Sequence, residues 1–158
     1  MARKVVRVGY KKTRAKGERF ETEFKDRYRI TVTLVSLKTL KDYDVDFTGE
    51  FYLRVKESAA HRSRTPNMGE IHLAKNQEIT FNPQLTLWYE HVTRRQGEEN
   101  ARELKISLYE RDPAKVDKKV ASMRLVVKIP QKTEYIILQD EEEQTKAKLR
   151  VMCSRTRY

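Results

Sequence analysis

A dense set of cationic side chains opens the sequence, and its chemistry is that of phosphate binding. Residues 1–20 contain eight Lys and Arg against Glu18 alone, which is +7 of the formal net charge of +11. Such a segment attracts polyanions, either nucleic-acid phosphates or anionic lipid headgroups. The alternatives are a solubilising tail or an edge strand through the apolar residues at positions 5–10. The predicted anion-binding residues of this basic arm are Arg3, Lys4, Arg7, Lys11, Lys12, Arg14, Lys16 and Arg19.

Carboxylate side chains gather in two segments that join predicted strands. Asp44 lies ahead of one strand and Glu50 opens it. Between two later strands lie Glu110, Asp112 and Asp117. Acidic loop residues commonly satisfy turns and pair with nearby Lys and Arg. Solvated turn acids are therefore the simplest interpretation of these residues taken alone.

Residues suited to catalysis are scarce in this sequence. None of His61, His72 and His91 has a cysteine or second histidine at metal-ligand spacing. There is no Gly-x-Ser-x-Gly and no nucleotide-binding glycine pattern, and the chain has five glycines in all. Cys153 lies on the apolar phase of an alternating segment, so we predict a buried small hydrophobic residue there. The sequence predicts a protein that is not an enzyme and has no small-molecule substrate.

Period-two alternation of apolar and polar residues dominates the chain after residue 26, which predicts strands with one buried face. The clearest alternations cover residues 28–34, 51–56, 104–109, 123–129 and 148–153. Shorter β-rich segments cover residues 70–73, 78–81, 85–92 and 134–138. Arg94–Glu103 is the one candidate for a helix, although Gly97 argues against it. The pattern predicts an all-β fold, an antiparallel β-sandwich of about eight strands.

Length and composition fit a single domain with an added arm. A chain of 158 residues with 38% apolar residues can bury one core. No segment approaches the ~18 consecutive apolar residues that a membrane span needs. The predicted organisation is a basic arm over residues 1–25 and a sandwich domain over residues 26–158. One cysteine and a start without a secretory signal lead us to expect a cytoplasmic protein, peripheral to a membrane.

The spacing of acids around the strands resembles that of a C2 domain, a β-sandwich module that often docks on phospholipid membranes. The family's first loop runs Asp, five residues, then Asp-Pro-Tyr; here Asp44 is followed after five residues by Glu50–Tyr52. The family's later loop has Asp-x-Asp after an apolar strand, and Glu110–Asp112 takes that place here. Asn82–Pro83 matches an Asn-Pro that precedes the family's middle strand. The resemblance covers residues 26–154.

The resemblance also implies a vestigial calcium site, with the ligands Asp44, Glu50, Glu110, Asp112 and Asp117. Calcium takes 6–8 oxygen ligands, and tight sites need several carboxylates close together. Two of the family's Asp positions are Glu here, and Lys118 and Lys119 stand where a third acid is expected. An ammonium group there repels the ion and neutralises the carboxylates. We therefore expect no cofactor, with calcium as the alternative.

Without the ion, the resemblance implies docking of an acidic partner on basic surfaces. Candidates outside the arm are Arg29, Arg54 and Lys56 on strands, and Arg62 and Arg64 in a loop. We predict a non-enzymatic module whose basic arm and sheet face dock on an anionic membrane surface or an acidic protein partner, with about 1 kcal/mol per Lys or Arg near the surface. One alternative is sequence-independent binding of nucleic acid or nucleoprotein through the same phosphate contacts. Another is a structural or assembly subunit that forms homo-oligomers through an edge strand or the arm.

Overall fold

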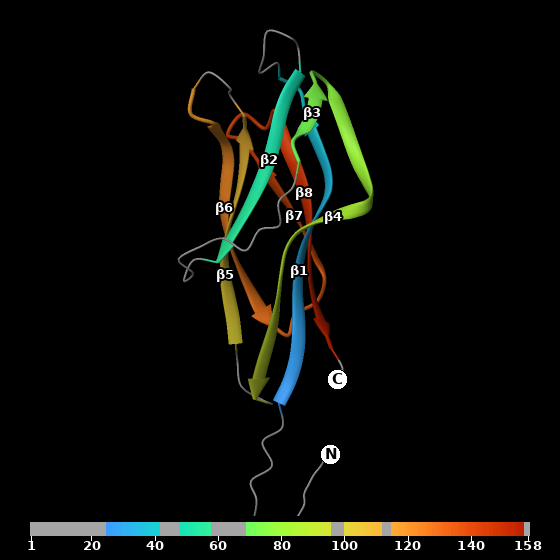
Figure 1. Cartoon of the computed structure of the whole chain (residues 1–158), viewed down its shortest axis with the longest axis vertical. Coiled ribbons are helices and arrows are strands. Elements are labelled where there is room, and N and C mark those ends of the chain that lie inside the picture. The colour runs from blue at the N-terminus through green and yellow to red at the C-terminus, as the bar shows by residue number, and fades with distance from the viewer. Residues whose placement is uncertain (1–24, 42–47, 58–68, 96–99, 112–114, 157–158) are drawn as a thin grey trace, which may run out of the picture. The chain divides into compact units, whose positions relative to one another are not determined.

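Eight strands make up the part of the chain that a computed structural model describes, which is residues 25–41, 48–57, 69–95, 100–111 and 115–156 (Figure 1). Within those residues there is no helix, and hence none long and apolar enough to cross a membrane. The strands in chain order are β1 (Lys25–Thr39), β2 (Thr48–Glu57), β3 (Ile71–Ala74), β4 (Gln77–Arg95), β5 (Asn100–Glu110), β6 (Lys118–Ile129), β7 (Glu134–Gln139) and β8 (Thr145–Arg155).

The strands form two four-stranded sheets, ordered β4–β1–β8–β7 and β3–β2–β5–β6. Pairing is antiparallel between β1 and β8 and between β7 and β8 in the first sheet. In the second sheet it is antiparallel from β3 through β2 and β5 to β6. The predicted all-β antiparallel sandwich of about eight strands is thus confirmed. Its strand order could not be predicted, because alternation within a strand does not name that strand's neighbours.

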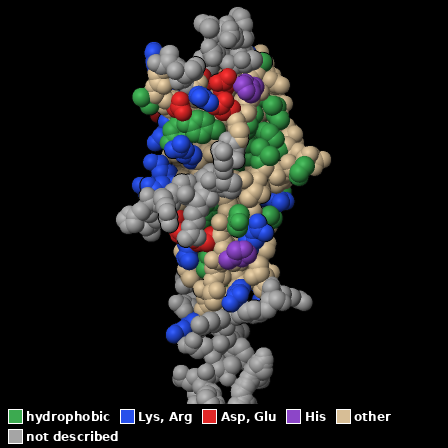
Figure 2. Space-filling model, viewed as in Figure 1, with side chains coloured by type: hydrophobic (Ala, Val, Ile, Leu, Met, Phe, Trp, Pro, Cys, Tyr) green, Lys and Arg blue, Asp and Glu red, His purple; other side chains and the backbone are tan. Residues whose placement is uncertain are grey.

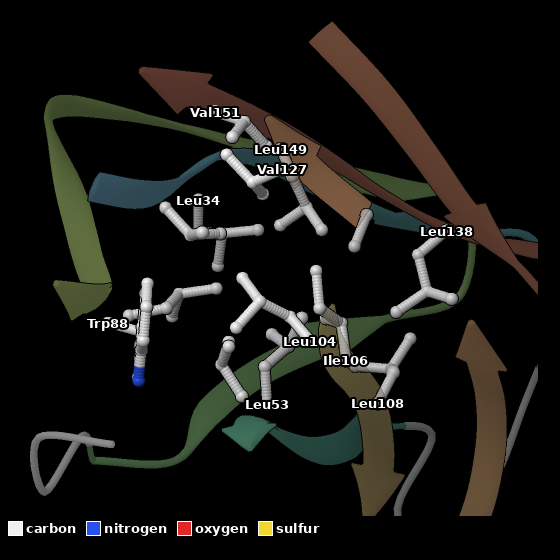
Figure 3. Close-up of a cluster of buried hydrophobic side chains, with 14 of the residues drawn as sticks. Leu34, Leu53, Trp88, Leu104, Ile106, Leu108, Val127, Leu138, Leu149 and Val151 are labelled. Carbon is white, nitrogen blue, oxygen red and sulfur yellow. The ribbon is translucent and has the colours of Figure 1, made fainter. Parts of the chain in front are cut away.

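The alternating residues of the two sheets meet in one core. Figure 3 shows side chains of Leu34 and Leu149 from the first sheet pointing toward Leu53, Leu104 and other residues of the second. Each of these four leucines is at most 1% exposed. Burial of apolar area at ~25 cal/mol per Å² is the main favourable contribution to such a fold.

Adjacent residues in β4 take opposite roles in that core. Trp88 is 1% exposed, whereas Tyr89 is 45% exposed. Trp88 therefore packs inside, and Tyr89 faces outward. Cys153 is only half-buried, although it packs against the core as its apolar phase predicts.

The one candidate for a helix, Arg94–Glu103, is not helical over those of its residues that the structure describes. Arg94 and Arg95 end β4, and Asn100–Glu103 begin β5. The latter four residues pair in register with residues 126–129 of β6. The ladder supplies the backbone hydrogen bonds that a short, glycine-containing helix would provide only weakly, since short helices are marginal without tertiary support.

The two expected segments 78–81 and 85–92 are parts of one strand, β4, which runs through Asn82–Pro83. Since β4 lies at the edge of its sheet, the missing N–H of Pro83 does not break a ladder on both sides.

The turn from β7 to β8 is built by the acidic run of residues 140–143. The Asp140 carboxylate accepts hydrogen bonds from the backbone N–H groups of Gln144 (2.6 Å) and Thr145 (3.0 Å).

The chain divides into two compact units, Met1–Asp26 with Thr93–Glu98, and Arg27–Val92 with Glu99–Tyr158. In the smaller unit, Arg94 Nη2 lies 3.4 Å from Asp26 Oδ2 and both side chains are largely buried. The larger unit contains the core and every site described below. Residues 1–24 lie outside the described residues, so the predicted basic arm and its boundary at residue 25 stay predictions.

Candidate functional site

Charged side chains from three strands of the second sheet meet at one end of the larger unit. Glu50 of β2 lies opposite His72 of β3 in the register, and the backbone N–H of Arg111 donates to the carbonyl of Glu50 at 2.8 Å. Ligand atoms of Glu50, Glu70 and His72 all lie within 4.8 Å of one another. Figure 2 shows acidic, basic and histidine side chains gathered near the upper end of the view. We call the group formed by Glu50, Glu70, His72 and Arg111 the acidic end.

The guanidinium of Arg111 is the positive charge within the acidic end. Its Nη1 donates to Oε2 of Glu70, and His72 Nδ1 lies 3.7 Å from Oε2 of Glu50. The hydrogen bond with Glu70 is the main cause that raises the pKa of Arg111, and Asp117 and Glu50 contribute through their charges. Arg111 therefore balances carboxylates from β2, from the start of β3 and from the segment before β6.

The described carboxylates do not by themselves fit a calcium site. Glu70 binds Arg111, and Asp117 accepts a hydrogen bond from the Tyr52 hydroxyl at 2.5 Å. Glu110 is 7% exposed and lies opposite Lys118 in the β5–β6 register. Calcium needs 6–8 oxygen ligands at one point, and Glu70 and Asp117 are already engaged by side chains of the chain. The predicted ligands Asp44 and Asp112 lie outside the described residues, so the full set stays a prediction.

Two tyrosines border the acidic end on the outward face of the second sheet. The rings of Tyr52 and Tyr109 stack with centroids 5.2 Å apart and planes 14° from parallel. The guanidinium of Arg54 lies 5.7 Å from the Tyr52 centroid and 5.9 Å from that of Tyr109. Burial, and then the bond to Asp117, raise the pKa of Tyr52 to about 12. The Tyr52 hydroxyl is therefore a neutral donor at physiological pH.

Cationic side chains from β2, β5 and β6 gather on the same outward face. The register places Lys56, Lys105 and Arg124 in one row across β2, β5 and β6, and it places Tyr52, Tyr109 and Lys119 in another. Cross-strand neighbours in one row lie on the same side of the sheet. We define the cationic face by five residues: Arg54, Lys56, Lys105, Lys119 and Arg124.

Repulsion among these cations shows how close together they lie. Lys119 lowers the pKa of Lys105, first through the repulsion between the two ammonium groups. Arg124 and Lys56 act in the same direction. Arg124 has a partial counterion, since its Nη1 donates to Glu103 at 3.2 Å. Like charges held at this spacing are unfavourable in the isolated protein, and a polyanion relieves the repulsion.

The structure brings together only some of the residues that the sequence singled out. Arg54 and Lys56 are exposed on the cationic face, as their polar phase predicts, but Arg29 lies on the outward face of the other sheet. The loop candidates Arg62 and Arg64 and the arm lie outside the described residues. Lys105, Lys119 and Arg124 were missed. Their polar phase was visible in the sequence, but only the register shows that they share one row or face with Lys56.

Three residues of the acidic end were also missed as members of one group: Glu70, His72 and Arg111. Glu50 pairs with His72 across the β2–β3 ladder, and residues 58–70 separate those two strands in the chain. No local spacing signals such a contact. Glu70 opens a predicted β-rich segment and Arg111 follows a predicted strand, and neither position indicates which charge its side chain meets.

Comparison with solved structures decides the fold, whereas the sequence matches no family model and no curated protein. The C2A domain of plant extended synaptotagmin 1 is similar with a TM-score of 0.50 and 15% identity, over 82% of this chain and 96% of that one. The fold is that of a C2 domain. Human GIVD cytosolic phospholipase A2 is similar with a TM-score of 0.50 and 13% identity, over 82% of this chain and 18% of that longer chain.

The C2 fold confirms the resemblance that the acidic spacing suggested. At identities of 13–15% the likeness covers the fold alone. What this C2 sandwich binds must be argued from its own side chains, and the cationic face and the acidic end are the two charged groups that the described residues offer.

Proposed function

We propose that this protein is a non-enzymatic C2 module that docks on an anionic membrane through its cationic face. The observation that carries the proposal is the clustering of five cations on one outward sheet face, which is dense enough for Lys119 to lower the pKa of Lys105. A surface of anionic lipid headgroups supplies the opposite charge over an extended area. Binding there relieves the repulsion among the cations, and this relief favours docking.

The expected strength follows from the number of cations. Each Lys or Arg near an anionic leaflet strengthens binding about fivefold, and the attraction fades within a Debye length of roughly 8 Å at physiological salt. A flat sheet face brings all five side chains within that distance at once. The basic arm, over residues 1–20, and the loop residues Arg62 and Arg64 add to the same attraction in this proposal.

Aromatic side chains beside the cations favour a lipid surface as the partner. The stacked pair Tyr52–Tyr109 borders the face, and Arg54 lies over both rings. Tyrosine combines an apolar ring with a polar hydroxyl and is enriched where proteins meet the headgroup layer. The C2 fold itself supports the proposal, because the family often docks on phospholipid membranes.

Co-sedimentation with vesicles tests the proposal. We expect the full chain to sediment with vesicles that contain phosphatidylserine, to stay in the supernatant with pure phosphatidylcholine, and to bind progressively less over a rising salt series. Equal binding to neutral vesicles contradicts the proposal, and so does a lack of binding at low salt.

A gel-shift series with duplex DNA runs in parallel. A DNA shift without vesicle binding would favour the nucleic-acid alternative.

Calcium and a chelator complete this experiment as two further conditions. Since Arg111 already balances the described carboxylates of the acidic end, we expect vesicle binding to be the same in both. Binding that appears only with calcium would show that Asp44 and Asp112 complete a calcium site with Glu50, and that docking runs through the loops instead of the cationic face.

A further inference from the structure

The outward face of the first sheet carries a second group of cations. Alternation along β1 and β8 directs Arg29, Lys38, Lys146, Lys148 and Arg150 away from the core, since the intervening residues, such as Val32, Leu149 and Val151, are buried. We call these five residues the β1–β8 face. Over the described residues of β1, β7 and β8, the outward positions carry no acid, because Asp26 and Glu134 fall on the other phase of their strands.

Half-exposed apolar side chains lie next to these cations. In the β7–β8 register Tyr135 lies opposite Arg150, and Ile137 lies opposite Lys148. Tyr135 is 54% exposed and Ile137 is 49% exposed. The Lys148 ammonium lies 5.1 Å from the Tyr135 ring centroid. Lysine stems and tyrosine rings arranged in this way suit the boundary between headgroups and acyl chains, where the apolar parts are buried and the polar ends stay hydrated.

Two arginines of this face have unsatisfied donors. The Nε atoms of Arg29 and Arg150 are buried and make no hydrogen bond within the described structure. The guanidinium of Arg29 lies 4.6 Å from the Tyr89 ring centroid, so an aromatic face and not a carboxylate is its neighbour there. These buried atoms lie out of reach of an external acceptor, so an anion on this face meets the other nitrogens of the two guanidiniums.

The two sheets of a sandwich pack through their inward faces, so their outward faces point in opposite directions. The cationic face and the β1–β8 face therefore lie on opposite sides of the same sandwich. We propose that the protein bridges two anionic bilayers, one on each face. This inference rests on the proposed docking of the cationic face and adds a second membrane to it.

An anionic bilayer fits the β1–β8 face better than an acidic peptide does. A peptide segment would be held by discrete charge pairs along a line, whereas these cations are spread over two strands among exposed Tyr135 and Ile137. A bilayer contacts the whole face at once. Its phosphates pair with the Lys and Arg side chains, and the upper part of its acyl chains contacts the tyrosine and isoleucine side chains.

A vesicle-clustering assay with the full chain tests the inference. Two populations of phosphatidylserine vesicles, one with donor and one with acceptor lipids, report clustering by energy transfer. We expect the wild-type protein to cluster them, and Lys146→Glu with Lys148→Glu to reduce clustering by about 30-fold, since each cation near the leaflet contributes about fivefold. The same variant is expected to keep its co-sedimentation within about twofold, because the cationic face is unchanged.

The controls separate the possible failures. Lys75→Glu with Lys132→Glu makes the same change in net charge at exposed turn and loop positions, and we expect it to cluster vesicles as the wild type does. Wild-type protein that sediments with vesicles but does not cluster them overturns the inference alone. Protein that does not sediment at all overturns the proposed function as well. Clustering unchanged by Lys146→Glu with Lys148→Glu, or a dimer by light scattering that this variant abolishes, also overturns the inference.

Discussion

Replacement of Lys105 and Lys119 by glutamate is expected to weaken binding to phosphatidylserine vesicles by at least 30-fold, since each lost cation removes about a fivefold gain and each new carboxylate adds repulsion. These two ammonium groups are close enough for Lys119 to lower the pKa of Lys105. The substitution exchanges the repulsion between two ammonium groups for that between two carboxylates, which have Lys56 and Arg124 as neighbours, so the folded state should be about as stable as the wild type. Partition into vesicles measured against lipid concentration gives the affinity, and thermal unfolding reports the stability.

The matched control is again Lys75→Glu with Lys132→Glu, which changes the net charge equally but leaves the cationic face intact. We expect this control to lose less than about threefold in vesicle affinity, from long-range electrostatics alone. If both double variants weaken binding equally, net charge governs attraction and the cationic face has no special role. If neither weakens it, attachment belongs to another part of the chain, and the basic arm is the first candidate.

Replacement of Arg102 by leucine is expected to cause the largest loss of stability among substitutions of charged residues. Arg102 Nε lies 2.9 Å from Glu90 Oε1 and 3.5 Å from Glu57 Oε2, and its Nη1 donates to Asn100 Oδ1 at 2.9 Å. Glu57 ends β2 and Glu90 lies in β4, so the arginine joins the two sheets. The three side chains are 27%, 20% and 12% exposed in the order Arg102, Glu57 and Glu90.

Removal of this cation takes a counterion from two largely buried carboxylates. Broken buried pairs cost 3–5 kcal/mol, and the partial exposure here reduces the expected loss to about 2–3 kcal/mol. For a chain of this size that corresponds to a fall in Tm of roughly 5–10 °C. Arg124→Leu is the control, because the Arg124–Glu103 pair is 68% and 46% exposed, and its loss should stay within about 1 kcal/mol. Equal losses for the two variants would contradict the assigned role of Arg102.

The strands were predictable because their alternation is a local signal. Ile30, Val32 and Leu34 are fully buried as their spacing predicts, and so are Ile106 and Leu108. The candidate helix at Arg94–Glu103 was ambiguous for the opposite reason. Its residues have no strong local preference, and the partner that decides their conformation is residues 126–129 of β6, which no window around residue 100 contains.

The candidate site was less predictable than the fold. Arg54 and Lys56 could be placed on an outward face, but their neighbours Lys105, Lys119 and Arg124 come from two other strands and depend on the register of two ladders. The acidic end shows the same limit. The loop acids suggested an ion site, whereas the described residues place Arg111 among the carboxylates. Arg111 lies two positions beyond the 104–109 alternation, and that alternation gives no sign of which charge the side chain will meet.

The orientation of the protein on the bilayer tests the central claim most directly. In a Cys153→Ala background, a fluorescent bimane label is placed on Ser122→Cys, an exposed position on the outward face of β6, or on Thr133→Cys, an exposed position in the β6–β7 loop. Phosphatidylserine vesicles with nitroxide-labelled lipids are added in large excess, so that each protein meets one bilayer. The account predicts strong quenching of the Ser122 label and weak quenching of the Thr133 label. Equal quenching, or stronger quenching at Thr133, would contradict docking through the cationic face.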